Sequence, residues 1–266
     1  MKVFISADIE GVTGVTAGSE TNKDHPDYKD FQVQMAKEVA AACEGAKEAG
    51  ATEIVIKDAH GSARNLIGDH LPDEAALIRG WSGHPYRMMQ GVDKSFNASF
   101  FIGYHAPGGR EGNPLAHTFK GKLISKITLN GDLASELSFN MLTSFYEKVP
   151  VVLVTGDEMI CADAREMLPE IHTVAVKRCV GGSTINISPQ SSIEKIKESA
   201  RTALADPGKN FVPEIPEFFT LTIHYNDFQE AYKASFYPGA ELISPKAVQY
   251  ENEDYPEILR MMHFVI

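Results

Sequence analysis

The chain has 266 residues, of which 43% are hydrophobic, and its formal net charge at pH 7 is −11. This length allows one large domain or two small ones with a sizeable buried core. The acidic balance argues against nucleic acid or an anionic membrane as a partner, because both bind through a basic face.

The first two thirds of the chain alternate between strand and helix signals. Short apolar runs at 1–6, 52–61, 98–106 and 149–158 predict strands, and a helical stretch spans 31–49, just before Gly50. This alternation is typical of βαβ units. We therefore predict an α/β fold with a largely parallel central sheet flanked by helices.

Before the run at 149–158, Asn130-Gly131 is a tight-turn signal, and helical spacing follows Leu133. For the remainder of the chain we predict a smaller α+β portion. Here the pattern predicts a strand at 172–176, a glycine-containing loop at 179–189 and a helix at 192–205, which Ser191 and Glu194 could cap. A Pro-rich connector at 207–217 and a strand at 218–225 follow. We place the boundary softly, with a metal-binding α/β core at 1–185 and a C-terminal subdomain packed on it at 186–266.

The three cysteines are far apart, and none belongs to a Cys-x-x-Cys pair: Cys43, Cys161 and Cys179. They are typical of reduced thiols in a cytoplasmic protein, so neither a disulfide framework nor a thiolate metal site is expected. The N-terminus does not resemble a secretory signal, and no stretch approaches the roughly 18 apolar residues of a membrane span. We expect a cytoplasmic protein with no membrane partner.

Potential metal ligands follow three of the predicted strands. Asp8 and Glu10 follow the first, Asp58 and His60 the second, and His105 the third. In an open α/β sheet the ligand crevice lies outside the carboxyl ends of the strands, so these side chains should converge there. Asp8 and Glu10 would repel each other unless a cation or a basic partner held them.

Each of these residues also has an ordinary alternative. Asp58 could be a turn former, Asp8 and Glu10 could lie in a solvated loop, and His105 could be a hydrogen-bonded core residue. A set of carboxylates and imidazoles without thiolates is typical of a hydrolytic zinc or manganese site, whereas calcium prefers oxygen alone. Two metals would need a bridging carboxylate, and together they would lower the pKa of a shared water and polarise a carbonyl.

Two further residues could complete a hydrolase. His117 lies twelve residues beyond His105, across a glycine-rich loop, and could transfer a proton to a leaving amine; a surface histidine is the alternative. Glu136 falls early in a predicted helix. Spacing alone favours an interaction between Glu136 and the helix N-terminus.

Five short segments, in this order, resemble the bacterial zinc-dependent D-aminopeptidases associated with dipeptide-transport operons: ADIEG at 7–11, KDAHG at 57–61, GYHA at 103–106, AHTF at 116–119 and GDLASELSFN at 131–140. The resemblance implies two Zn²⁺ per subunit, with Asp8 as the bridge. It implies as ligands Asp8, Glu10, His60, His105 and Glu136. It also implies that His117 is catalytic, that D-amino acids are removed from the N-terminus of short peptides, and that the chain forms a homodecamer.

The loop at 106–115 is the main departure from the family pattern, and because it would form a wall near the substrate, it bears on specificity for D-alanine. Arg110 in this loop could receive a peptide carboxylate, although a solvent-facing arginine is the more common case. The stretch 80–91, which includes Trp81, could be a subunit contact, with His84 an ordinary surface residue. A dinuclear phosphoesterase and a non-catalytic, metal-dependent peptide-binding protein stay open as alternatives.

Overall fold

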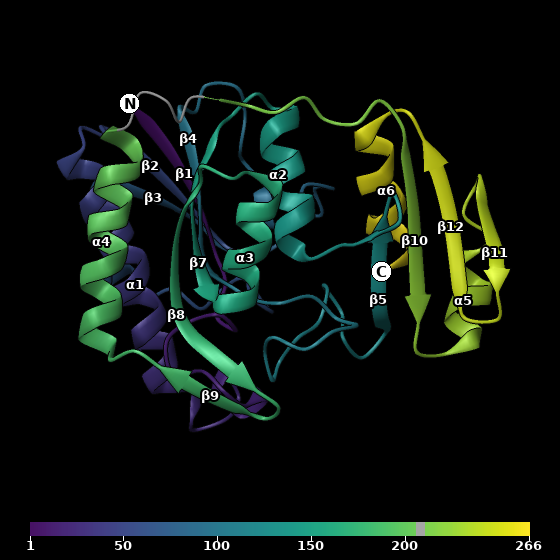
Figure 1. Cartoon of the computed structure of the whole chain (residues 1–266), viewed down its shortest axis with the longest axis horizontal. Coiled ribbons are helices and arrows are strands. Elements are labelled where there is room, and N and C mark those ends of the chain that lie inside the picture. Colours follow the sequence, from purple (N-terminus) through teal and green to yellow (C-terminus); the bar gives the residue numbers. More distant parts are fainter. Residues whose placement is uncertain (206–210) are drawn as a thin grey trace.

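The computed structural model describes residues 1–205 and 211–266. Two β-sheets lie side by side, with helices on both faces of the first sheet and two further helices beside the second (Figure 1). Three clusters of buried apolar side chains form the core, two around the first sheet and one under the second. The predicted α/β class is confirmed.

The first sheet has the strand order β3-β2-β1-β4-β7-β8-β9. Its strands are parallel except β9, which pairs antiparallel with β8. The strands are β1 (Lys2–Ala7), β2 (Glu53–Asp58), β3 (Ala75–Ile78), β4 (Ala98–Tyr104), β7 (Val151–Asp157), β8 (His172–Val180) and β9 (Ser183–Asn186). Strands β4 and β7 are buried along their whole length, which explains why they appear in the sequence as continuous apolar runs.

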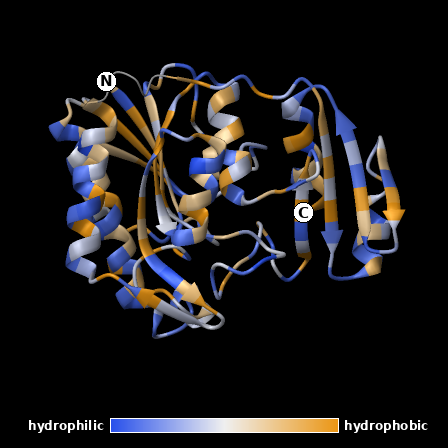
Figure 2. Cartoon of the chain, in the orientation of Figure 1, coloured by the Kyte–Doolittle hydropathy of each residue, from blue (hydrophilic) through white to orange (hydrophobic). Residues whose placement is uncertain are grey.

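Helices cover both faces of this sheet. Helices α1 (Tyr28–Glu48) and α4 (Pro189–Ala205) pack on one face, and α2 (Glu136–Tyr146) and α3 (Glu158–Met167) pack on the other (Figure 1). Both hydrophobic and hydrophilic residues recur along the length of α1 and α4, as expected for amphipathic helices (Figure 2). The helices α1 and α4 approach closely at Gly45, where a Cβ atom would lie 2.1 Å from the carbonyl oxygen of Lys197.

The second sheet is antiparallel and has the strand order β11-β12-β10-β5-β6. Its elements are β5 (Ile124–Leu129), β6 (Asp132–Leu133), β10 (Phe219–Tyr225), β11 (Ala240–Ser244), β12 (Ala247–Asn252) and the helices α5 (Phe228–Ala234) and α6 (Tyr255–Val265). Asn130 and Gly131 form the predicted tight turn between β5 and β6, and both have positive φ angles, of 53° and 92°. The pattern at 226–266 led to no prediction of α5, α6, β11 or β12.

Two local predictions were wrong. The segment predicted as a loop at 179–189 instead contains β9, which forms a hairpin with the end of β8. Helix α4 begins at Pro189, so Ser191 lies inside its first turn and cannot be the cap; the hydroxyl oxygen of Ser188 accepts from the Ser191 N–H at 3.2 Å instead. Three short 3₁₀ helices also occur, at Gly18–Thr21, Gly68–His70 and Arg87–Met89.

The proposed division at 185/186 stays a prediction. The second sheet takes β5 and β6 from before this boundary, and α4, which follows it, packs on the first sheet and on α1. The Pro-rich connector predicted at 207–217 lies in part outside the described residues. Among the helices that the structure describes, none is long and apolar enough to cross a membrane.

Candidate metal centre

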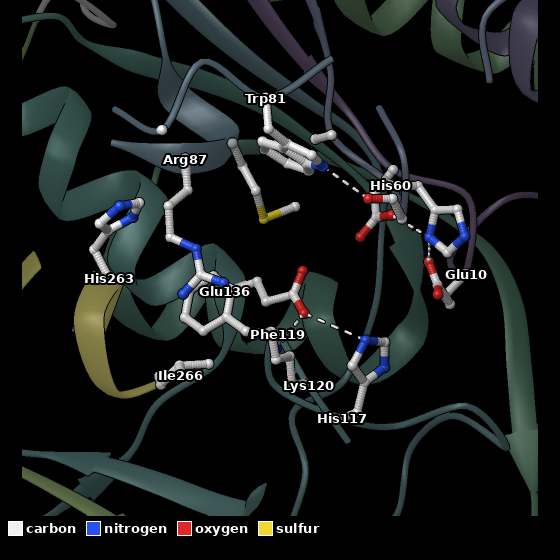
Figure 3. Close-up of a pocket in the computed structure, with 15 residues that line it drawn as sticks. Glu10, His60, Trp81, Arg87, His117, Phe119, Lys120, Glu136, His263 and Ile266 are labelled. Carbon is white, nitrogen blue, oxygen red and sulfur yellow. Dashed lines mark hydrogen bonds and ion pairs between the residues drawn. The ribbon is translucent and has the colours of Figure 1, made fainter. Parts of the chain in front are cut away.

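The carboxyl ends of three neighbouring strands supply four of the predicted site residues. The strand order β2-β1-β4 brings His60, the pair Asp8 and Glu10, and His105 to one edge of the sheet. His117, from the loop between β4 and β5, and Glu136, the first residue of α2, lie at the same place. Figure 3 shows Glu10, His60, His117 and Glu136 around one cavity. The predicted convergence of these side chains is therefore seen in the structure.

Asp8, Glu10 and His60 form the first of two compact groups. Each offers one ligand atom, and these atoms lie within 4.8 Å of one another. His60 Nδ1 lies 2.9 Å from Glu10 Oε2 and 3.4 Å from Asp8 Oδ1. The other ring nitrogen, Nε2, lies 2.9 Å from the carbonyl oxygen of Thr21.

His105, His117 and Glu136 form the second group, by the same distance criterion. The two imidazole rings are stacked, with centroids 4.6 Å apart. Glu136 Oε1 lies 3.9 Å from His105 Nε2 and 3.5 Å from His117 Nε2. The Nδ1 atoms lie 2.9 and 2.8 Å from the carbonyl oxygens of Ala106 and Leu115.

The carboxylate of Asp8 lies between the two groups. Its Oδ1 faces His60, while its Oδ2 lies 3.5 Å from His105 Nε2. Asp8 is almost fully buried, and Oδ1 also accepts a hydrogen bond from the N–H of Ile9 at 2.9 Å. One side chain at the end of the central strand thus contacts both histidines.

The hydrogen bonds of the three histidines determine which ring nitrogen faces the carboxylates. A carbonyl oxygen only accepts, so Nε2 of His60 and Nδ1 of His105 and His117 bear the hydrogen. In the neutral ring the remaining nitrogen presents a lone pair to the neighbouring carboxylates. Glu10 Oε2 and His105 Nε2 are buried without a hydrogen-bond partner among the described residues. Carboxylates that face the lone pairs of neutral imidazoles fit a bound cation, which would take the place of a shared proton.

The charges in this cluster shift the pKa values of its members. Burial and the neighbouring charge of Glu10 raise the pKa of Asp8 to about 7. Burial would raise the pKa of Glu10, but His60 holds it well below its ordinary value. Burial opposes protonation of His105, yet Glu136 and Asp8 raise its pKa to about 9, and Glu10 and Asp8 likewise raise that of His60. The site therefore attracts positive charge strongly.

The backbone that follows β1 is fixed at close range. The N–H groups of Asp8 and Gly11 donate to the carbonyl oxygens of Ile102 and Gly103, each at 2.8 Å. A Cβ atom on Gly11 would lie 1.8 Å from the carbonyl oxygen of Tyr104, so only glycine fits. The first metal-ligand candidates are thus held against β4, the strand that His105 follows.

Asp58 has a supporting position and is not among the grouped ligand candidates. Its carboxylate accepts from the N–H groups of Asn65 and Leu66, at 2.5 and 2.7 Å. The side-chain amide of Asn65 donates to Asp58 at 2.8 Å and to the carbonyl oxygen of His60 at 2.7 Å. Asp58 therefore holds the backbone at His60 through Asn65 and does not contact the imidazole.

A cavity of ≈ 640 Å³ opens beside the two groups. Asp8, Glu10, His60, His117 and Glu136 line it, together with side chains that the sequence did not identify as part of the site: Trp81, Arg87, Met88, Phe119, Lys120, His263 and Ile266. Trp81, Arg87 and Met88 belong to the segment 80–91. A role of this segment as a subunit contact stays a prediction. His84 is exposed, as expected, and does not line the cavity.

Arg110 does not line this cavity. It pairs with Asp163 of α3, so it is neither a substrate-facing nor an unpaired solvent-facing arginine. The cavity arginine is Arg87, which belongs to the short 3₁₀ helix after Trp81. Its only signal in the sequence is a cation within an aromatic, glycine-containing segment.

The site consists of buried carboxylates and imidazoles at the carboxyl ends of parallel strands. Together with the comparisons to known proteins, it defines a metal-dependent peptidase. The family model Peptidase_M55, described as D-aminopeptidase, matches residues 1–264. The chain belongs to this family. The resemblance seen in the five sequence motifs is therefore confirmed.

Two relatives match over almost the whole chain. The D-aminopeptidase of Bacillus subtilis (strain 168) is 28% identical over 264 residues, which are 98% of this chain and 95% of the relative. A solved structure described as "Zn-dependent D-aminopeptidase DppA from Bacillus subtilis, a self-compartmentalizing protease" has a TM-score of 0.93 and 27% identity, and the alignment covers 100% of this chain and 96% of that one. The fold is shared from end to end.

Proposed function

We propose that the chain is a dinuclear-zinc aminopeptidase that removes an N-terminal D-amino acid from short peptides. The observation that favours two metal positions over one is the carboxylate of Asp8, whose oxygens face His60 and His105. The solved relative is described as zinc-dependent and as a D-aminopeptidase, which supports the choice of metal and of substrate.

In this proposal Asp8 bridges the two zinc ions. Glu10 and His60 complete the first position, and His105 and Glu136 complete the second. The bound zinc ions would supply a water of lowered pKa and would polarise the scissile carbonyl. The ligand set contains no thiolate, which agrees with a hydrolytic site rather than a structural zinc site.

His117 is the proposed proton carrier. Its Nδ1 bears a hydrogen that it donates to Leu115, so Nε2 is the atom that takes up a proton and gives it to the departing amine. His117 is about a quarter exposed, whereas His105 is almost fully buried. His117 also belongs by distance to the second ligand group, so a role as a zinc ligand is the competing assignment.

The phosphoesterase alternative has one observation in its favour. Such an enzyme needs cationic side chains near its metals, and Arg87 and Lys120 line the cavity. The family assignment favours the peptidase, and phosphate esters belong in the assay as the competing substrate class.

Hydrolysis of paired D- and L-aminoacyl-glycines by the zinc-loaded protein tests the proposal. We expect turnover of the D series and a much lower rate for the L series. Preferential turnover of the L series would leave an aminopeptidase without the proposed stereochemistry. Turnover of neither series, with two zinc ions bound per chain, would exclude the peptidase, and turnover of phosphate esters alone would favour the alternative.

We also propose that the chain assembles into a homodecamer. The solved relative is described as self-compartmentalizing. Large hydrophobic side chains are exposed on α5, on the strand β11 and near the end of α6: Phe228, Tyr232, Leu242, Ile243 and Phe264. Light scattering should give a mass ten times that of the 29.2 kDa chain, and a monomer at working concentration would contradict the assembly.

A further inference from the structure

Arg87 presents an unpaired cationic group to the cavity. Its Nη1 is buried and has no hydrogen-bond partner among the described residues. No carboxylate of the described chain forms an ion pair with it, whereas Arg110 is paired with Asp163. Figure 3 shows the guanidinium of Arg87 inside the cavity, on the side away from Glu10 and His60. A buried, unpaired guanidinium is costly unless an anion binds to it.

The position of this guanidinium is fixed. Its Cζ lies 4.3 Å from the ring centroid of Phe119, in a cation–π contact. The N–H of Phe119 donates to Glu136 Oε1 at 2.6 Å, so the supporting ring is tied to the second ligand group. Arg87 itself has a φ angle of 49°, a backbone conformation that is uncommon outside glycine and often occurs at functional sites. The cationic group is thus held at a set place relative to the metal ligands.

The cavity therefore has two unlike ends. The carboxylates of Asp8 and Glu10 lie with His60 at one end, where cations are expected to bind, and Figure 3 shows Glu136 between Glu10 and Arg87. Arg87 lies towards the other, and a guanidinium binds a carboxylate through two parallel hydrogen bonds. A short peptide has the matching polarity, since the amino group next to its scissile bond and its terminal carboxylate lie a few residues apart. A longer or amidated peptide lacks the carboxylate at that distance.

We propose that Arg87 binds the free C-terminal carboxylate of the substrate and so restricts the enzyme to very short peptides. The inference rests on the proposed aminopeptidase function and specifies its substrate class. Lys120 is the other cation that lines the cavity, but it is exposed, so water screens its charge.

The test compares a D-aminoacyl-glycine that has a free carboxylate with its C-terminal amide, using the zinc-loaded protein. The wild type should prefer the free acid by about 10- to 100-fold in kcat/KM, mainly through KM, because the contact lies away from the scissile bond. Arg87→Met should hydrolyse both peptides with nearly equal kcat/KM. Arg87→Lys should retain part of the preference, since it keeps the charge and loses the planar fork.

Arg79→Met is the matched control, because Arg79 is exposed and does not line the cavity; it should behave as the wild type. An equal rate for both peptides in the wild type, or an undiminished preference in Arg87→Met, would overturn the proposal. Loss of the preference in Lys120→Met alone would assign the carboxylate to Lys120 instead. Zinc content and melting temperature show whether each variant is folded.

Failure of the peptidase proposal itself would have a different signature. The protein would then hydrolyse neither peptide. Calorimetric binding of the same two peptides would still decide the role of Arg87, since the free acid should bind more tightly to the wild type and not to Arg87→Met. Equal binding of acid and amide to the wild type would reject the contact.

Discussion

The ammonium group of Lys177 lies 2.5 Å from the carbonyl oxygen of Glu10, although the two residues are 167 positions apart. Lys177 belongs to β8 and is almost fully buried. It also donates to the carbonyl oxygens of Val12 and Val15, at 3.4 and 2.6 Å. A single buried cation thus holds the loop that contains Glu10, and burial lowers its pKa.

Replacing Lys177 with Met should weaken both the fold and the first metal position. The change removes one donor from each of three carbonyl oxygens, of which those of Glu10 and Val12 keep a second donor, in Asn113 and in the N–H of Val15. We therefore expect the free energy of unfolding to fall by about 2 kcal/mol. Urea denaturation measures this loss, and zinc titration measures the weaker binding. Arg178→Met, at the exposed neighbour on the same strand, should change neither, and equal effects in both variants would contradict the role of Lys177.

Asp8 and Glu10 should differ in what their loss does to the metal content. Asp8 contacts histidines of both groups, whereas within the described residues Glu10 makes a close contact with His60 alone among the histidines. Asp8→Ala should therefore empty both positions, and Glu10→Ala should chiefly weaken one. Elemental analysis of the purified variants, with the exposed Asp132→Ala as the control, measures the zinc content. Equal losses from the two variants would count against a bridging Asp8.

Alanine variants of His117 and His105 should differ, with the first losing catalysis and the second losing bound metal. If His117 transfers a proton, His117→Ala should retain its zinc and lose about 10²- to 10⁴-fold in kcat. His105→Ala, which removes the buried neighbour of Asp8 and Glu136, should lose zinc. Loss of zinc from His117→Ala to the same degree would instead identify His117 as a ligand.

The stabilisation by zinc should increase with pH. In the metal-free protein the folded-state pKa is raised to about 7 for Asp8 and to about 9 for His105. The folded state then binds more protons than the unfolded state between about pH 4 and pH 9, so the metal-free protein loses stability as pH rises through this window. Zinc binding requires that Asp8 and His105 have lost their protons, so the stabilisation by zinc should grow as the pH rises.

Thermal unfolding with zinc and with a chelator, at pH 6, 7.5 and 9, measures this difference. We expect the separation of the two melting temperatures to widen at each step. In Asp8→Asn, which cannot lose a proton, the widening between pH 6 and pH 7.5 should be smaller. A separation that stays constant or narrows with pH would contradict the assignment of these groups as ligands.

The part of the site at strand ends could be predicted from the sequence because of simple geometry. Apolar runs identify β1, β2 and β4, and the order β2-β1-β4 brings the residues that follow them to one edge. His117 and Glu136 lie in a loop and at a helix start. The sequence pattern made His117 a candidate with a surface histidine as the alternative, it favoured a helix-terminus role for Glu136, and the family resemblance assigned both to the site. Their place in the site depends on pairing between distant segments.

Arg87 and the second sheet show where sequence patterns were insufficient. Arg87 lies in irregular backbone with a positive φ angle, for which no periodicity exists. Strand β5 pairs with β10, which lies far from it in the chain, and β10 pairs with β12 across the intervening helix α5. Local sequence patterns could therefore not predict this sheet. Similarly, Ser191 fits a capping motif, but the helix begins two residues earlier.

The pairing of β5 with β10 makes the site dependent on the far end of the chain. Both His117 and Glu136 flank the β5–β6 hairpin, and β10 is the strand that holds this hairpin in the second sheet. Asn130 at its tip is bound to Thr220 through both backbone and side chain, at 2.9 and 2.7 Å. A chain shortened after residue 185 would keep all five proposed ligands and His117 in its sequence, yet it would lose the strand that supports Glu136 and His117. Catalytic competence therefore has to arise late in synthesis, after β10 has been made and can pair.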